Sequence, residues 1–175
     1  MQIDDDIRWL VALVSDTGMR LAEAAGLSLD DFNLQGDIPF VEVRKHPWRS
    51  LKTSASARVI PLSGMALWAA QRILQQTETS SYAFPRYNRG SRTSSNSASA
   101  AINKWLRNYV PAGCTMHSFR HSMRDRLRAV QCPADIADQI GGWATNGVGQ
   151  GYGSGYPIEV LMDWVGKTVA ATDVG

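Results

Sequence analysis

Apolar side chains recur at helical spacing along most of this chain, which predicts a mainly helical protein. Residues 65–76 are the clearest case, because one face is apolar and Ser63 precedes them as an N-cap. That inner face is expected to consist of Leu67, Ala70, Ile73 and Leu74. Further helices are predicted over residues 7–14, 21–25, 100–109, 117–130 and 134–140, and after Pro157.

Two short segments predict strands, residues 40–43 and residues 58–62. The polar stretch 46–57 between them predicts a hairpin or a longer excursion. Residues 91–99 are rich in serine and predict a loop or the entry to a helix. The expected fold is therefore mainly α with a small antiparallel β-sheet, and 175 residues suit one domain with a sizeable core.

Composition narrows the class of protein without identifying a function. Apolar residues make up 44% and charged residues 19%, which argues against a disordered chain. The net charge of +2 is only mildly basic, but residues 86–128 are rich in arginine and hold Asp125 as their only carboxylate. A surface built from that segment could follow phosphates, or it could be an ordinary solvated face.

Cysteine usage and the absence of targeting segments set further expectations. Cys114 and Cys132 are too isolated for a disulfide framework and share no zinc-ligand spacing with the histidines. A reduced cytoplasmic or nucleoid setting follows. No apolar run reaches the roughly 20 residues that span a membrane, and the acidic N-terminus does not fit a signal peptide. We therefore expect neither a metal site nor membrane contact.

Two clusters could carry chemistry, although each has a plainer interpretation. Arg20 follows Gly18 at the junction of two predicted helices, and Glu23, one turn on, could hold its guanidinium. The same pair could be a surface ion pair of little energetic consequence. His117 and Arg120 lie three positions apart on one helical face, which suits a phosphate but also fits a solvated basic face.

A third cluster contains Trp143, after a Gly-Gly pair, and Tyr152. Five of the nine residues 147–155 are glycine, which predicts a mobile or tightly turned segment. A tyrosine there could stack, pack or act as a nucleophile, and Tyr156 competes for the same role.

In their order and spacing, these residues resemble the tyrosine recombinase (phage integrase) family. The resemblance rests on Arg20 in TGMRLAEAAGLSLDDF, Lys52 before ARVIPLS, His117-x-x-Arg120 in HSFRHSMRDRL, Trp143, and a tyrosine nine residues later. It extends over nearly the whole chain, and the motifs are specific in combination rather than singly. The family most often has a second histidine where this chain has Trp143, which is a known substitute.

The resemblance implies a catalytic domain that recombines or integrates DNA at specific sites without a metal, ATP or another cofactor. Tyr152 would attack the scissile phosphate and form a 3′-phosphotyrosyl link. Arg20 and Arg120 would hold the non-bridging oxygens, where negative charge gathers in the transition state. His117 would donate to the same phosphate or help to take the tyrosine proton.

The remaining site residues are assigned on the same resemblance. Lys52 would protonate the leaving 5′-oxygen, and its placement before RVIPL favours it over Lys45. Trp143 would donate its indole N–H and wall the site, while Glu23 would orient the first arginine or support its helix. The nine-residue offset from Trp143 favours Tyr152 over Tyr156 as the nucleophile.

Double-stranded DNA is the expected partner, with other protomers in a synaptic tetramer. Candidate phosphate contacts, several of which could be plain solvated surface, are Arg49, Arg86, Arg89, Arg92, Lys104, Arg107 and Arg124. The segment after Pro157 carries an apolar stripe of Ile158, Leu161, Trp164 and Val165. In the family such segments often dock on a neighbouring protomer, so the C-terminal helix is the expected protomer contact.

The family normally has a helical core-binding domain before the catalytic one. Residues 1–175 are expected to form the catalytic domain alone, as a fragment that binds DNA weakly and with strong salt dependence. Two other functions stay open. A catalytically silent DNA-binding or regulatory module is one, although the full set of site residues argues against it. A type IB topoisomerase-like enzyme, which would relax supercoils without pairing two sites, is the other.

Overall fold

The structure is a computed structural model that describes residues 4–53, 56–76, 80–143 and 155–172. Within these ranges the helices are α1 Asp6–Thr17, α2 Leu21–Ala25, α3 Gly64–Leu74, α4 Ser95–Leu106, α5 Met116–Ala129, α6 Ala134–Gly141 and α7 Ile158–Thr172. The strands are β1 Phe32–Asn33, β2 Phe40–Val43 and β3 Arg58–Pro61, with a separate hairpin of β4 Asn88–Arg89 and β5 Arg92–Thr93. This confirms the mainly helical fold with a small antiparallel sheet.

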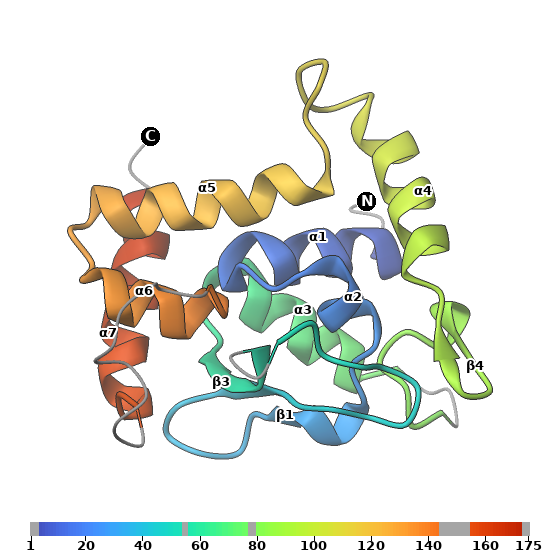
Figure 1. The fold of residues 1–175 in the computed structure, drawn as a ribbon, viewed down its shortest axis with the longest axis horizontal. Helices are drawn as coiled ribbons and strands as arrows, with labels where there is room; N and C mark the ends of the chain where they lie inside the picture. The colour runs from blue at the N-terminus through green and yellow to red at the C-terminus, as the bar shows by residue number, and fades with distance from the viewer. Residues whose placement is uncertain (1–3, 54–55, 77–79, 144–154, 173–175) are drawn as a thin grey trace.

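The central helix is α1, which packs against α3 and α5. Its N-terminus is capped by Asp5, whose carboxylate accepts a hydrogen bond from the backbone N of Arg8 at 3.0 Å. Leu10 and Leu13 are fully buried along its length. In Figure 1, α5 runs along one edge of the molecule above α1, and the three-stranded sheet lies at the opposite edge.

The sheet has the order β1-β2-β3 and is antiparallel throughout. Val41 pairs with Ile60, and both side chains are fully buried, so one face of the sheet joins the core. The last strand, β3, is also in contact with α6 and α7. Its first residue, Arg58, therefore lies where the sheet meets the C-terminal helices.

Three local expectations differ from the structure. Leu74 is 40% exposed, because the buried face of α3 consists of Ala66, Ala69, Ala70 and Ile73. α4 begins at Ser95, five residues before the predicted start, since burial of Ala98 draws the serine-rich segment into the helix. The β4–β5 hairpin, which lacks an apolar alternation, was not predicted. None of the helices that the structure describes is long and apolar enough to cross a membrane.

Candidate active site

The site is built around the sharp junction between α1 and α2. Gly18 ends α1 in the left-handed conformation, with φ of 66°, and its N–H donates to the carbonyl of Val14 at 3.0 Å. A side chain there would be strained and would also lie 3.2 Å from Met123 Cγ of α5. Arg20 then occupies the N-cap position of α2 in extended conformation, so its side chain leaves from a fixed backbone.

Glu23 is the carboxylate that organises this junction. It is 3% exposed and accepts hydrogen bonds from the backbone N of Arg20 at 2.9 Å, from Arg20 Nη1 at 2.8 Å and from Arg58 Nη2 at 3.1 Å. Burial alone would raise the pKa of Glu23, but the charge and hydrogen bond of Arg58 and the donors of Arg20 hold it below its ordinary value. The carboxylate is therefore ionised at neutral pH and shared between two arginines.

The guanidinium of Arg20 reaches two further acceptors. Its Nη1 donates to Ser56 Oγ at 3.1 Å, and its Nη2 donates to the carbonyl of Gly142 at 3.3 Å. These contacts join the segment before β3 and the end of α6 to the α1–α2 junction. The side chain of Arg20 nevertheless stays 26% exposed, so its guanidinium remains accessible to a ligand.

Arg120 approaches the same region from α5. It is 4% exposed, and its Nη1 donates to the carbonyls of Gly18 and Gly141. Burial, followed by the positive charges of Arg20 and Arg58, lowers the pKa of Arg120 to about 10. The guanidinium is still charged at neutral pH, and the neighbouring cations add to the effect of burial on its pKa.

The ring of Trp143 contacts two arginines of α5. The guanidinium carbon of Arg120 is 4.7 Å from the Trp143 ring centroid and that of Arg124 is 5.2 Å away. Trp143 packs so closely over Gly141 that an added Cβ there would lie 2.0 Å from its ring. Its backbone N donates to the carbonyl of Asp138 at 3.0 Å. The indole therefore forms a fixed wall beside Arg120.

His117 stands exposed on the first turn of α5. Its ring lies edge to face with that of His121, with centroids 4.6 Å apart. Partial burial and then nearby positive charges lower the pKa of His117 below its ordinary value. Those charges belong to His121, Arg120, Arg20 and Lys52. The imidazole is thus neutral at physiological pH and free to accept a proton.

Lys52 is exposed, and its charge acts on His117 as described above. Its segment is attached to Arg20 through Ser56, whose Oγ hydrogen-bonds to Thr53 Oγ1 at 3.1 Å and accepts from the Thr53 backbone N at 3.4 Å. The segment that carries Lys52 is therefore anchored beside Arg20. The alternative, Lys45, is also exposed, but its charge is not among those that act on His117.

The described residues of this region carry more positive than negative charge. The charges that act on Arg120 come from the cations Arg20, Arg58 and Arg124 and from a single carboxylate, Glu23. Arg124 has a partner of its own, Asp138, at 3.5 Å. An anion placed between Arg20 and Arg120 would relieve the remaining repulsion, and a phosphate matches both the charge and the planar donors of two guanidinium groups.

Tyr152 lies outside the described residues. The competing tyrosine, Tyr156, donates its hydroxyl to a carboxylate oxygen of Asp135, and this hydrogen bond raises the pKa of the phenol. Its backbone N donates to Gln139 Oε1 at 2.8 Å, and Gln139 Nε2 donates to its carbonyl at 3.1 Å. Tyr156 is therefore bound to α6 through both its backbone and its hydroxyl.

The candidate phosphate contacts fall into two groups. Five of them are exposed: Arg86, Arg89, Arg92, Lys104 and Arg107. Arg124 is half-buried against Trp143. The prediction that Arg49 contacts phosphate is wrong, because Arg49 is only 4% exposed. Its guanidinium donates to the carbonyl of Glu23 at 2.6 Å and to the carbonyl of Arg44. In this structure it supports the backbone of α2 and cannot meet a phosphate.

Sequence reasoning missed two residues of this site, Arg58 and Ser56. Arg58 was treated only as the first residue of a strand, yet it is 9% exposed and holds Glu23. The available signal was its position inside a buried strand, where a charged side chain requires a partner. Ser56 stood in a polar stretch that offered no such signal, and its role depends on contacts 36 residues away.

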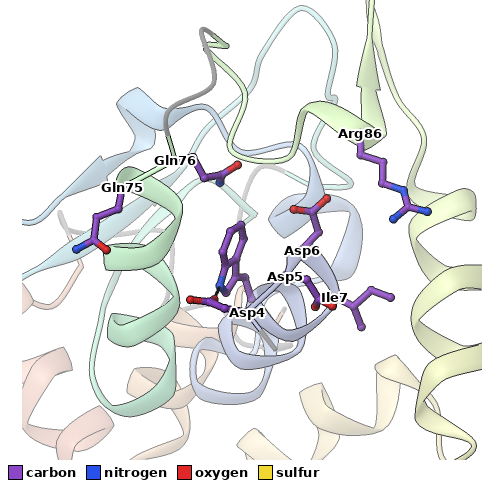
Figure 2. Close-up of a pocket in the computed structure, with 8 residues that line it drawn as sticks. Asp4, Asp5, Asp6, Ile7, Gln75, Gln76 and Arg86 are labelled. Atoms are coloured by element: carbon purple, nitrogen blue, oxygen red, sulfur yellow. Dashed lines mark hydrogen bonds between the residues drawn. The ribbon is translucent and has the colours of Figure 1, made fainter. Parts of the chain in front are cut away.

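A cavity among the described residues lies elsewhere, at the opposite end of α1. It has a volume of about 470 Å³ and is lined by Asp4, Asp5, Asp6, Ile7, Trp9, Gln75, Gln76 and Arg86. Figure 2 shows its acidic side chains at the start of α1, with Arg86 across from them. The length of α1 separates this cavity from Gly18 by about 18 Å. Its acidic lining does not suit a phosphate.

Comparison with known proteins relates both sequence and fold to one group. A model described as the phage integrase family matches residues 3–154. A search of curated proteins found no match. Among solved structures, the integrase of transposon Tn1549 bound to circular intermediate DNA gives a TM-score of 0.58 at 16% identity, covering 89% of this chain and 54% of that one.

Two further structures show the same fold. The site-specific recombinase XerH bound to its difH substrate before cleavage gives a TM-score of 0.54 at 17% identity, covering 79% of this chain and 40% of that one. The XerA recombinase gives a TM-score of 0.54 at 18% identity, covering 97% of this chain and 56% of that one. The chain thus spans about half the length of the solved chains that it matches, and at these identities the likeness concerns the fold.

Proposed function

Because the chain belongs to the phage integrase family, we propose that it cleaves and rejoins double-stranded DNA at specific sites, with Tyr152 as the nucleophile. The observation that carries the proposal is the convergence of Arg20, at the α1–α2 junction, and Arg120, from α5, on one region where positive charge is incompletely neutralised. The similar structures of the Tn1549 integrase and of XerH contain DNA, which supports DNA as the partner.

The proposed reaction is a transesterification. Tyr152 Oη attacks the scissile phosphorus, the bond from phosphorus to the 5′-oxygen breaks, and a 3′-phosphotyrosyl link remains. The tyrosine proton passes to His117, whose lowered pKa keeps it neutral and able to accept, and Lys52 donates a proton to the leaving 5′-oxygen. Attack by a 5′-hydroxyl of the partner duplex reverses the step and exchanges strands without an external energy source.

The arginines and Trp143 stabilise the transition state in this proposal. Arg20 and Arg120 donate to the non-bridging oxygens, where negative charge develops, and both are held in place before DNA arrives. Trp143 donates its indole N–H to the phosphate and keeps the guanidinium of Arg120 in position. Glu23 orients Arg20, because it holds both the backbone and the side chain of that residue.

The exposed basic residues are proposed to follow the DNA backbone, and they would fix the register of the protein without reading sequence. These are Arg86, Arg89, Arg92, Lys104 and Arg107. Because the chain carries a limited number of such contacts, binding to DNA should be weak and should fall steeply with salt. Action on chromosomal or element DNA would place the protein with the nucleoid.

We further propose that protomers assemble as a synaptic tetramer through α7. Leu161 and Val165 of this helix are buried in their own chain, against β3 and α5. A contact between protomers would therefore use the outer side of α7, where Glu159 and Asp163 are exposed.

Covalent trapping tests the proposed chemistry. A pool of nicked duplexes with randomised sequence around the nick is incubated with the protein, and covalent adducts are separated on a denaturing gel and sequenced. The parent and Tyr156→Phe are expected to form an adduct, and Tyr152→Phe is expected to form none. An adduct that survives Tyr152→Phe would move the nucleophile to another residue.

The same experiment separates the other two functions. A protein that binds duplexes but never forms an adduct would be a silent DNA-binding module. Relaxation of a supercoiled plasmid by the adduct-forming protein, without strand exchange between two sites, would indicate a topoisomerase-like enzyme.

A further inference from the structure

A second arginine, Arg58, shares Glu23 with the partly exposed Arg20, and the proposed chemistry does not use it. Its side chain is 4% exposed, and its three nitrogens donate to three different segments of the chain. Nε donates to the carbonyl of Ile140 in α6 at 2.8 Å, Nη1 to the carbonyl of Ser56 at 2.7 Å, and Nη2 to Glu23 of α2 at 3.1 Å.

We propose that Arg58 is the positioning residue that aims Arg20 at the scissile phosphate, by fixing all three residues that hold the Arg20 guanidinium. This inference rests on the proposed function of the site. The guanidinium of Arg20 donates to Glu23, Ser56 and Gly142. Arg58 touches the same three residues, through a carboxylate oxygen, a carbonyl and close packing, respectively.

The packing against Gly142 is unusually tight. A Cβ added to Gly142 would lie 2.6 Å from Arg58 Nη1 and 2.8 Å from its Cζ, so the flat guanidinium lies directly against the backbone. Gly142 also has φ of 61°, which ends α6 and turns its carbonyl toward Arg20. Arg58 thus packs against the turn that presents this acceptor.

Only an arginine suits this position. The three acceptors lie in three directions around one planar group, which matches the fixed fork of guanidinium donors. A lysine has its three donors on one nitrogen at the end of a flexible chain, so it cannot reproduce bonds that leave from three separate nitrogens. Arg58→Lys therefore keeps the charge but releases at least one of the segments that Arg58 joins.

The charge of Arg58 also determines how firmly Arg20 is held. Glu23 is shared between Arg20 and Arg58, and its charge also acts on Arg49 and Arg120. Without Arg58, the buried carboxylate would keep Arg20 as its one side-chain donor. Burial would then favour protonation of Glu23, which in turn loosens its hold on Arg20.

The first test follows Glu23 directly and does not require activity. The chain contains four glutamates, so selective ¹³C labelling of glutamate gives four side-chain carboxyl signals that can be followed by NMR against pH. Glu23→Gln identifies the signal of Glu23. The midpoint of Glu23 is expected to rise in Arg58→Met, and the midpoint of Glu42 is expected to stay unchanged.

Arg126 provides the matched control. It is also a largely buried arginine, with 20% of its side chain exposed, and it pairs with Asp16 at 3.0 Å and donates to the carbonyl of Ser15. Arg126→Lys should lower stability as Arg58→Lys does, but it should leave the midpoint of Glu23 in place.

The second test is the rate of adduct formation at saturating DNA, measured well below the melting temperature of each variant. Arg58→Lys is expected to slow cleavage by about 10- to 100-fold, because small displacements of a catalytic group cost rates of this order. Arg126→Lys should slow it by less than about twofold.

Each outcome decides a separate question. An unchanged Glu23 midpoint in Arg58→Met, or equal slowing of cleavage by the Arg58 and Arg126 variants, would overturn the positioning role. If Arg58→Met does not fold, Arg58→Lys is compared with Arg126→Lys for both the Glu23 midpoint and the rate of cleavage. A parent protein that forms no adduct while the Glu23 midpoint still responds to Arg58 would refute the proposed function but leave the link between Arg58 and Glu23 established.

Discussion

Arg20 and Gly142 are 122 residues apart in the chain, and a hydrogen bond of 3.3 Å from Arg20 Nη2 to the Gly142 carbonyl joins them. The acceptor is available because Gly142 ends α6 in the left-handed conformation, one residue before Trp143. The end of α6, the α1–α2 junction and the start of β3 therefore meet at one point. A substitution in any one of these three segments should therefore displace residues in the other two.

The first prediction concerns Gly142→Ala. An alanine at φ of 61° is strained, and its Cβ would lie 2.6 Å from Arg58 Nη1, so we expect a loss of about 2–4 kcal/mol in the free energy of unfolding. Gly90→Ala is the control, since Gly90 has φ of 64° but no atom within 4 Å of an added Cβ. Urea denaturation measures the free energy of unfolding of both variants, which share the backbone strain but not the clash with Arg58. Equal losses of unfolding free energy in the two variants would show that Arg58 moves aside freely.

A contact in this site could be predicted from the sequence only where its two residues lie close together in the chain. The pair of Arg20 and Glu23 was predictable, because three positions on a helix bring the two side chains together. The role of Arg58 was not, because its acceptors at Glu23 and Ile140 lie 35 and 82 residues away. Helical periodicity carries no information about contacts of that range.

The same reasoning explains the error at Arg49. A basic residue in a polar stretch ordinarily lies on the surface, and the sequence offered no reason to expect otherwise. The side chain instead turns inward, because backbone carbonyls of Glu23 and Arg44 need donors inside the fold. The family motif led to the residues that we propose to bind phosphate, but the polar contacts that support them come from the tertiary structure.

The second prediction contrasts Arg49 with Arg89. Arg49→Met should lower the melting temperature, because it leaves two buried carbonyls without their donor, and it should leave the salt dependence of DNA binding unchanged. Arg89→Met should leave the melting temperature nearly unchanged, since Arg89 is exposed, and it should weaken the salt dependence of DNA binding. If Arg89 meets a phosphate, the slope of log K against log salt becomes shallower by about 1. A shallower slope for Arg49→Met would contradict its buried placement.

The third prediction is a pH dependence of stability. The pKa of Glu23 is lowered in the folded protein, so its stabilisation is present above the ordinary carboxyl value of 4.5 and is lost as pH falls through and below that value. At neutral pH, Glu23→Gln should cost about 3–5 kcal/mol, because it leaves Arg58 buried without its charge partner.

Denaturation with urea at several pH values tests this sign. The difference in unfolding free energy between the parent and Glu23→Gln should shrink as the solution is made acidic. Glu42→Gln is the control, because the side chain of Glu42 is 44% exposed and its carboxylate lies 3.6 Å from Arg44 Nη1, whose side chain is 42% exposed. Its effect should be small at every pH. If the difference in unfolding free energy between the parent and Glu23→Gln stays constant with pH, the pKa of Glu23 is not lowered in the folded state.

The last prediction separates the two sides of α7. Its inner side belongs to the core, since Leu161 is 1% exposed and Val165 is fully buried. Leu161→Ala should therefore cost about 2–5 kcal/mol of stability in the isolated protein. Truncation after Gly155 would lose the same packing, so any failure of a truncated protein to assemble could reflect unfolding alone.

The outer side can be tested without disturbing the fold. Glu159 and Asp163 are exposed, and replacing both by lysine should leave the melting temperature nearly unchanged. If α7 joins protomers, the double variant should bind a single DNA site normally but form fewer synaptic complexes in a gel-shift assay. A double variant with Asp37→Lys and Asp125→Lys, at two exposed positions outside α7, controls for the same added positive charge. Normal synapsis by the double variant would exclude these two residues from the contact between protomers, while the role of α7 in its own domain would still be judged from Leu161→Ala.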